Sequence, residues 1–206
     1  LDVEKVSAGR YQLNFPLYRL KSLKFPGKEN PFADKFGEIE APPFIFEIVK
    51  KLGIESKFQG AVHNTDTKKC IIVLHENTTR NELLSVVRCP DELLKLHPEA
   101  DFIRGVVVSF KPKDPVAQGF TDKNGKSYDY VSRYFAPWNG INEDPATGSS
   151  HCVLAELWSK YDEPGKELYA FQCYPNRGAQ FYVNPRADRL GITGEAVTVI
   201  SGSAHF

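Results

Sequence analysis

The segment Asn142–His151, with the sequence Asn-Glu-Asp-Pro-Ala-Thr-Gly-Ser-Ser-His, contains the residue types and spacing that could do chemistry. Two acids come directly before a run of small residues, and an apolar helical pattern follows. The first amides of a helix lack intrahelical acceptors, and the helix dipole adds positive potential there. Gly148, Ser149 and Ser150 are small enough to let a ligand approach those amides, and the two hydroxyls add donors. The segment therefore predicts a helix start that receives an anion.

A structural helix with an acidic entry would explain the same residues. Thr147 alone would suffice as the N-cap of such a helix. Positions 153, 154, 157, 158 and 161 are apolar, which predicts a core helix over about 148–161. A core helix whose first turn faces a cleft would favour the functional interpretation. The sequence pattern by itself leaves both interpretations open.

Other chemical motifs do not occur in the sequence. There is no Gly-x-Ser-x-Gly nucleophile motif, and Thr147-Gly148-Ser149 lacks the upstream glycine and the lysine of a phosphate-binding loop. Five histidines are scattered along the chain without a ligand spacing, so we expect no metal site. The nearest basic residue before the motif is Arg133, which argues against a phosphate or nucleotide cradle there.

The bulk composition excludes two classes of partner. The 26 basic and 26 acidic side chains balance, and the longest apolar runs are far too short to span a bilayer. We therefore expect neither nucleic acid nor a membrane as a partner, because both require excess positive charge or long apolar segments. The four cysteines show no paired spacing, which favours a cytosolic, reducing compartment. The chain contains no methionine, which is typical of a fragment.

The periodicities predict a mixed α+β fold in which strands outnumber helices and do not alternate regularly with them. Helices are expected at 44–52, 80–88 (with Thr79 as its cap), 91–96 and 148–161. Strands are expected at 1–6, 10–15, 60–64, 68–75, 102–110, 127–135, 168–174, 178–183 and 196–201. Connections are expected at 21–43, 111–126 and 136–147.

Three stretches of sequence carry a resemblance to a known family. Ser-Arg-Tyr-Phe-Ala-Pro-Trp at 132–138, Gly-Ile at 140–141 and Glu-Asp-Pro-Ala-Thr-Gly-Ser at 143–149 resemble the signature of PhzF-type phenazine biosynthesis-like proteins. Ala-Phe-Gln-Cys at 170–173 and Arg-Gly at 177–178 continue the match and look most similar to the animal branch. The resemblance extends from Ser127 to the end, whereas residues 20–126 match only in general layout.

This resemblance implies a diaminopimelate-epimerase-like architecture, in which each of two lobes is a curved, mostly antiparallel sheet wrapped around a central helix. Residues 1–20 would be the last strands of an N-terminal lobe, and residues 21–206 the C-terminal lobe with its central helix at about 148–161. The active site would lie between the lobes. Family members catalyse cofactor-independent isomerisation of small carboxylate-bearing molecules by moving a proton.

Carried over residue by residue, the resemblance also implies a set of site residues. Ser149 and the amides of Gly148 and Ser149 would hold the substrate carboxylate, and Asp144, the implied catalytic residue of this chain, would bind a polar or cationic group. The implied substrate-binding residues are Asp144, Thr147, Gly148, Ser149, Arg177 and Gly178.

The family's first-lobe motifs are absent from this sequence. Its acid/base glutamate lies in an Asn-Leu-Ser-Glu-Thr segment, and its histidine in a Cys-Gly-His segment; neither string occurs, and Glu76-Asn77-Thr78 is no substitute. We therefore expect that roughly a hundred residues precede Leu1 in the intact protein, and that this chain alone is inactive. A non-catalytic binding or scaffold protein is the alternative. We also expect a homodimer, because an unpaired hairpin at residues 1–15 would expose a strand edge.

Overall fold

A computed structural model of the chain describes residues 2–162, 165–197 and 199–203. Its strands are β1 (Asp2–Ser7), β2 (Arg10–Pro16), β3 (Lys21–Lys24), β4 (Glu38–Glu40), β5 (Phe58–Asn64), β6 (Lys69–Leu74), β7 (Gly105–Phe110), β8 (Tyr130–Ala136), β9 (Ile141–Asp144), β10 (Leu168–Gln172), β11 (Ala179–Pro185) and β12 (Arg189–Glu195). Its α-helices are α1 (Ala33–Phe36), α2 (Pro43–Lys51), α3 (Arg80–Leu84), α4 (Pro90–Leu96), α5 (Pro115–Gln118) and α6 (Gly148–Ser159), with 3₁₀ turns η1 (Glu55–Lys57) and η2 (Pro137–Asn139).

The strands form one mostly antiparallel sheet in the order β1-β2-β12-β11-β10-β8-β7-β6-β5-β3-β4, with β9 paired to β8. The pairs β10–β8, β6–β7 and β3–β4 are parallel. Helix α6 contacts β2, β12 and β11 and also β6, which is four strands beyond β11 in the sheet order. A flat sheet could not offer both sets of strands to one helix, so the sheet curves around α6. The predicted α+β fold with a sheet wrapped around a central helix is confirmed.

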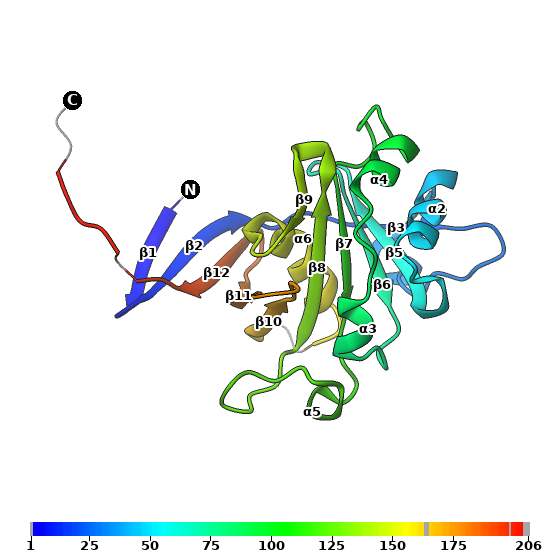
Figure 1. Cartoon of the computed structure of the whole chain (residues 1–206). Coiled ribbons are helices and arrows are strands. Elements are labelled where there is room, and N and C mark those ends of the chain that lie inside the picture. The colour runs from blue at the N-terminus through cyan, green and yellow to red at the C-terminus, as the bar shows by residue number, and fades with distance from the viewer. Residues whose placement is uncertain (1, 163–164, 198, 204–206) are drawn as a thin grey trace.

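The helix α6 is buried all round, and every residue from Ser150 to Trp158 is inaccessible to solvent or nearly so. A helix that is apolar on all sides is stable only inside a core. One core cluster surrounds α6 on the concave face of the sheet, and a second lies between the opposite face and the helices α2, α3 and α4. Figure 1 shows the β1–β2 hairpin and the C-terminal segment together at one end of the molecule and α2 near the other.

The hairpin is not isolated from this sheet, because β2 pairs with β12 along its whole length, from Arg10 opposite Glu195 to Pro16 opposite Arg189. Strand β1 lies at the edge of the sheet with Val3 and Val6 exposed. The assignment of residues 1–20 to a separate lobe stays a prediction, as does the homodimer. In the described ranges, no helix combines the length and the apolar character needed to cross a bilayer.

The expected helix at 80–88 is shorter in the structure, where α3 ends at Leu84. The guanidinium of Arg133 donates hydrogen bonds to the carbonyls of Leu83, Leu84 and Val86, so a distant strand satisfies the carbonyls at and just beyond the end of the helix. The expected strand at 196–201 is wrong. Strand β12 ends at Glu195, where its partner β2 begins, and the side chains of Val197, Val199 and Ile200 are exposed. Residue 198 is outside the described residues.

Short elements inside three expected connections were missed. The residues 21–43 contain β3, α1 and β4; the residues 111–126 contain α5; and the residues 136–147 contain η2 and β9. The two edge elements β4 and β9 have three or four residues each and carry mainly polar or charged side chains. Such strands form because a neighbouring strand offers backbone hydrogen bonds, and their own sequence gives no clear period.

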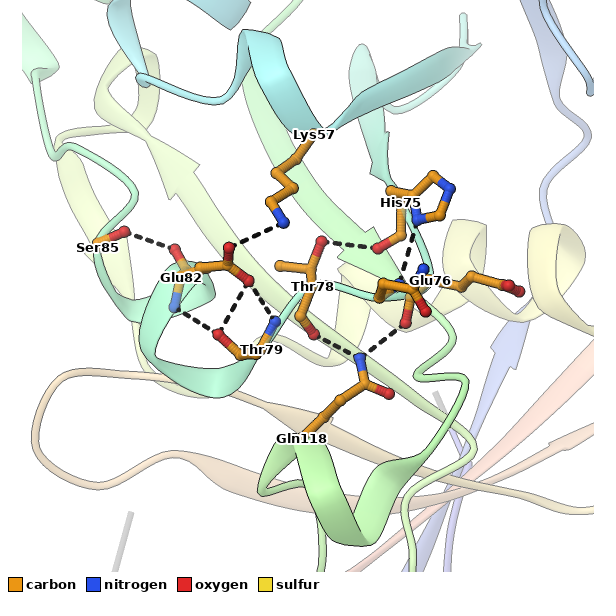
Figure 2. A network of polar contacts seen from close by, with 9 residues as sticks. Lys57, His75, Glu76, Thr78, Thr79, Glu82, Ser85 and Gln118 are labelled. Atoms are coloured by element: carbon orange, nitrogen blue, oxygen red, sulfur yellow. Dashed lines mark hydrogen bonds and ion pairs between the residues drawn. The ribbon is translucent and has the colours of Figure 1, made fainter.

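The helix α3 begins at a complete capping box. The hydroxyl of Thr79 accepts from the amide of Glu82, and the Glu82 carboxylate accepts from the amide of Thr79, which completes a capping box. Figure 2 shows Lys57 paired with the same carboxylate and, beside it, Gln118 donating to the carbonyls of Glu76 and Thr78. The Glu76–Thr78 turn is therefore fixed by structural contacts, and Thr79 is confirmed as the cap.

We expect Thr79→Ala to lower the free energy of unfolding by ~1 kcal/mol, because one amide of α3 loses its acceptor. Urea denaturation followed by circular dichroism measures this change. The matched control is Thr65→Ala, at an exposed threonine without a described side-chain hydrogen bond, which should change stability by no more than ~0.5 kcal/mol. Equal losses from both variants would contradict the capping role.

The histidine inside α6 gives the core a defined pH dependence. Complete burial lowers the pKa of His151 to about 3, while Tyr130 Oη lies 2.7 Å from its Nδ1 atom. The unfolded chain takes up this proton first as the pH falls, since its histidine titrates near 6.5. His151 therefore removes stability as the pH falls from about 6.5 towards 3, by ~2 to 3 kcal/mol at pH 4.5.

We expect this loss between pH 7 and pH 4.5 to shrink in His151→Gln, which cannot titrate, when urea midpoints are compared at each pH. The control His75→Gln changes an exposed histidine and should keep the slope of the parent chain. A parent-like slope in His151→Gln would show that the acid sensitivity comes from other groups.

Candidate functional site

The N-terminus of α6 is open, although the sequence offers a residue that could cap it. Thr147 is the N-cap residue, but its side chain makes no cap hydrogen bond to the helix. Its hydroxyl instead donates to Asp144 Oδ2 at 2.7 Å. Across the part of the chain that the structure describes, no side chain accepts from the amides of Gly148 and Ser149. Ser149 is exposed and Gly148 is half-buried, so the first turn of the helix is accessible to a ligand. We call Asp144, Thr147, Gly148 and Ser149 the α6 site.

A buried glutamine from β10 holds this site in shape. Gln172 Oε1 accepts from the amide of Thr147 at 2.9 Å, and Gln172 Nε2 donates to the carbonyl of Asp144 at 2.5 Å and to Thr147 Oγ1 at 3.0 Å. The side chain is fully buried. Gln172 therefore fixes the path of the chain from Asp144 into α6, and it satisfies the Thr147 amide that a ligand would otherwise have to satisfy.

The two acids before the helix have different roles, because β9 points successive side chains to opposite faces. Glu143 is buried and forms two hydrogen bonds with the guanidinium of Arg133, at 2.6 and 2.9 Å. Asp144 is half-buried and lies on the side of α6. Glu143 is thus committed to the interior, and the only acid of this pair that a ligand could contact is Asp144.

The carboxylate of Asp144 is pre-positioned by its own turn. Its Oδ1 atom accepts from the amide of Ala146 at 3.2 Å, and Oδ2 accepts from Thr147. Asp144 is also the register partner of Tyr134 on β8, and burial together with the Asp144 charge raises the pKa of Tyr134 to about 12. A carboxylate held beside an open helix start could bind a cationic or hydroxyl group of a ligand whose carboxylate lies on the amides.

The structure brings Gly178 to this site, whereas Arg177 has no described hydrogen bond or ion pair with it. Gly178 packs so closely on Gln172 that a Cβ atom would collide with the Gln172 carbonyl and the ring of Phe171, so this position requires glycine. Arg177 is exposed, and none of its described contacts is a hydrogen bond or an ion pair. Of the six residues that the sequence predicted, Asp144, Thr147, Gly148 and Ser149 form one site; Gly178 lies against it through Gln172.

Sequence reasoning missed Gln172 as a site residue, although it lies inside a stretch that carried the family resemblance. The available signal was a lone glutamine in an otherwise apolar strand, Leu-Tyr-Ala-Phe-Gln, since a buried amide in such a strand needs partners. Groups of three or more side chains suited to a metal are absent from the described residues. The chemistry that this geometry supports is the binding of a small anion beside a carboxylate.

Comparison with known proteins gives a consistent result. Residues 42–202 match the family model described as phenazine biosynthesis-like protein. The phenazine biosynthesis-like domain-containing protein 1 of Mus musculus is 33% identical over 93% of this chain and 57% of its own length. A protein of Halalkalibacterium halodurans named as an uncharacterized isomerase is 30% identical over 62% of this chain and 45% of its own length. The chain thus spans about half the length of these relatives.

Solved structures give the same fold. The crystal structure of a phenazine biosynthesis protein PhzF family member from Enterococcus faecalis superimposes with a TM-score of 0.65, covering 99% of this chain and 60% of that one at 24% identity. At this identity the likeness concerns the fold alone. It extends to the whole of the described sheet, including the β1–β2 hairpin.

We expect Gln172→Leu to lower the free energy of unfolding by about 2 to 3 kcal/mol, because the buried amide of Thr147 and carbonyl of Asp144 lose their partners. Hydrogen exchange should report the same change locally, with the Thr147 amide losing its protection while amides in β6 keep theirs. Gln59→Leu, at an exposed glutamine on β5, is the control and should alter neither measurement. If the Thr147 amide keeps its protection from exchange in Gln172→Leu, Gln172 does not hold the start of α6.

Proposed function

The chain belongs to the phenazine biosynthesis-like protein family, and we propose that it supplies the carboxylate-holding half of an isomerase active site. The observation that carries this proposal is the first turn of α6, where Ser149 is exposed and where the amides of Gly148 and Ser149 have no acceptor among the described side chains. The name of the H. halodurans relative, an isomerase, supports the reaction class.

In this proposal, the substrate is a small metabolite that carries a carboxylate. The amides of Gly148 and Ser149 and the Ser149 hydroxyl bind the carboxylate, because unpaired amides and the helix dipole both favour negative charge. Asp144 binds the amino or hydroxyl group at the other end of the molecule. The reaction moves a proton within the substrate without a cofactor, and a general acid/base outside this chain performs the transfer.

The proposed acid/base and the α6 site contribute differently to the reaction rate. A positioned general acid/base contributes roughly 100-fold to 10,000-fold to a rate, whereas the α6 site contributes binding and orientation. The intact protein should therefore be an isomerase, and the 206-residue chain should bind carboxylates with little or no turnover. We place the protein in the cytosol and expect the intact form to be a homodimer.

We expect the intact gene product to exchange a carbon-bound proton for deuterium when small amino or hydroxy acids are incubated in deuterated water and followed by NMR. The 206-residue chain should be at least ~100-fold slower. In the intact protein, Ser149→Ala and Asp144→Asn should each slow exchange at limiting substrate by roughly 10-fold or more, since each removes one substrate contact. The control is Ser159→Ala, at the opposite end of α6, which should keep full activity.

Equal exchange rates for the chain and the intact protein would refute the proposal that the general acid/base lies outside this chain. If neither exchanges, yet carboxylates raise the melting temperature of both in a Ser149-dependent manner, the family member is a binding protein. Stabilisation by inorganic phosphate in preference to carboxylates would instead assign the α6 site to phosphate compounds.

A further inference from the structure

A lysine that is distant in sequence from the α6 site lies on the face of the sheet that packs around α6. Lys69 is the first residue of β6, and alternation along the strand places it on the same face as Ile71 and Val73, which pack in the core around α6. The residue is only 7% exposed. The strand thus begins with a largely buried lysine side chain on the concave side of the sheet, the side that holds α6.

This ammonium has no partner among the described residues: it makes neither a hydrogen bond nor an ion pair there. Buried lysines are almost always paired, because an isolated charge loses its hydration without compensation. The desolvation is strong enough to lower the pKa of Lys69. The contrast is Lys111, which is more exposed and yet pairs with Asp162. An anion from outside the described fold would complete the contacts of Lys69.

Four neighbouring strands connect Lys69 to the α6 site. The ammonium lies 6.0 Å from the ring centre of Tyr134 on β8, and Tyr134 is the register partner of Asp144 on β9. Strand β7 lies between β6 and β8. Its Gly105 is the register partner of Lys69, and a Cβ atom at Gly105 would collide with the Tyr134 ring. Because β7 has no side chain at this point, the Tyr134 ring can lie across it towards Lys69.

Two separate groups for negative charge therefore lie on the α6 side of the sheet, the amides that begin α6 and the ammonium of Lys69. Tyr134 on β8, near the ammonium, and its register partner Asp144 on β9 link the two. We propose that Lys69 is a substrate-binding residue, and that its ammonium pairs with a second carboxylate of the substrate. The substrate class is then a small dicarboxylate or amino dicarboxylate. This inference rests on the proposed function and specifies the substrate of the same site.

The test compares succinate with butyrate, which have the same chain length and differ in one carboxylate. Binding to the 206-residue chain is followed by the amide shifts of Gly148 and Ser149 in two-dimensional NMR. Succinate should bind at least about tenfold more tightly than butyrate, because a charge-assisted hydrogen bond is added. Lys69→Met should abolish this preference and leave butyrate binding unchanged, whereas Lys69→Arg should retain most of it.

The matched control is Lys123→Met, at an exposed lysine in the loop before β8, which should retain the full succinate preference. Melting temperatures of all variants are measured beside the titrations, and Lys69→Met should be at least as stable as the parent because it replaces a largely buried lysine that has no partner among the described residues. The selectivity ratio therefore separates a binding role from a structural one.

Four results would overturn the inference. A full succinate preference in Lys69→Met would show that another group holds the second carboxylate. Equal binding of both acids to the parent chain, sensitive to Ser149→Ala, would leave the proposed function intact and remove the dicarboxylate class. Binding of inorganic phosphate in preference to succinate, lost in Lys69→Met, would assign the lysine to phosphate. If neither acid binds and Ser149→Ala has no effect, the proposed function fails together with the inference.

Discussion

The buried guanidinium of Arg133 is the contact on which the arrangement of the site depends. It forms two hydrogen bonds with Glu143 and donates to three carbonyls at the end of α3, so β8, β9 and α3 meet at one side chain. A buried guanidinium has few alternative arrangements of its partners, because each hydrogen bond that is not formed leaves a buried polar group unsatisfied. Once Glu143 points inward to Arg133, Asp144 must point to the other face of β9, beside α6.

The N-terminus of α6 has no side-chain cap in this arrangement. Thr147 could have capped α6, but its hydroxyl donates to Asp144, and its amide is bound by Gln172. Among the described residues, no side chain accepts a hydrogen bond from the amides of Gly148 and Ser149. The start of α6 therefore lacks a side-chain cap, whereas the start of α3 has a complete capping box.

Residues that are local in sequence were predicted well, and residues brought together by the sheet were not. The start of α6, its apolar pattern, the cap at Thr79 and the grouping of Asp144 with Gly148 and Ser149 follow from spacings of a few residues. Gln172 and Lys69 lie on other strands, and no periodicity relates them to α6. Short strands such as β4 and β9 were missed for the same reason, because their partners, and not their composition, make them strands.

The sequence by itself determined the family, the α+β class, the central helix and the acid-then-small-residue pattern at its start, since these depend on side-chain type and short-range spacing. Only the tertiary structure decided that Glu143 is the buried acid, that Thr147 does not cap the helix, that Gln172 holds the start of α6, and that Lys69 lies on the sheet face around this helix. The physical reason is burial: a polar group removed from water must find partners in space. The register of the sheet determines which partners the group finds, and the sequence of a single segment does not specify that register.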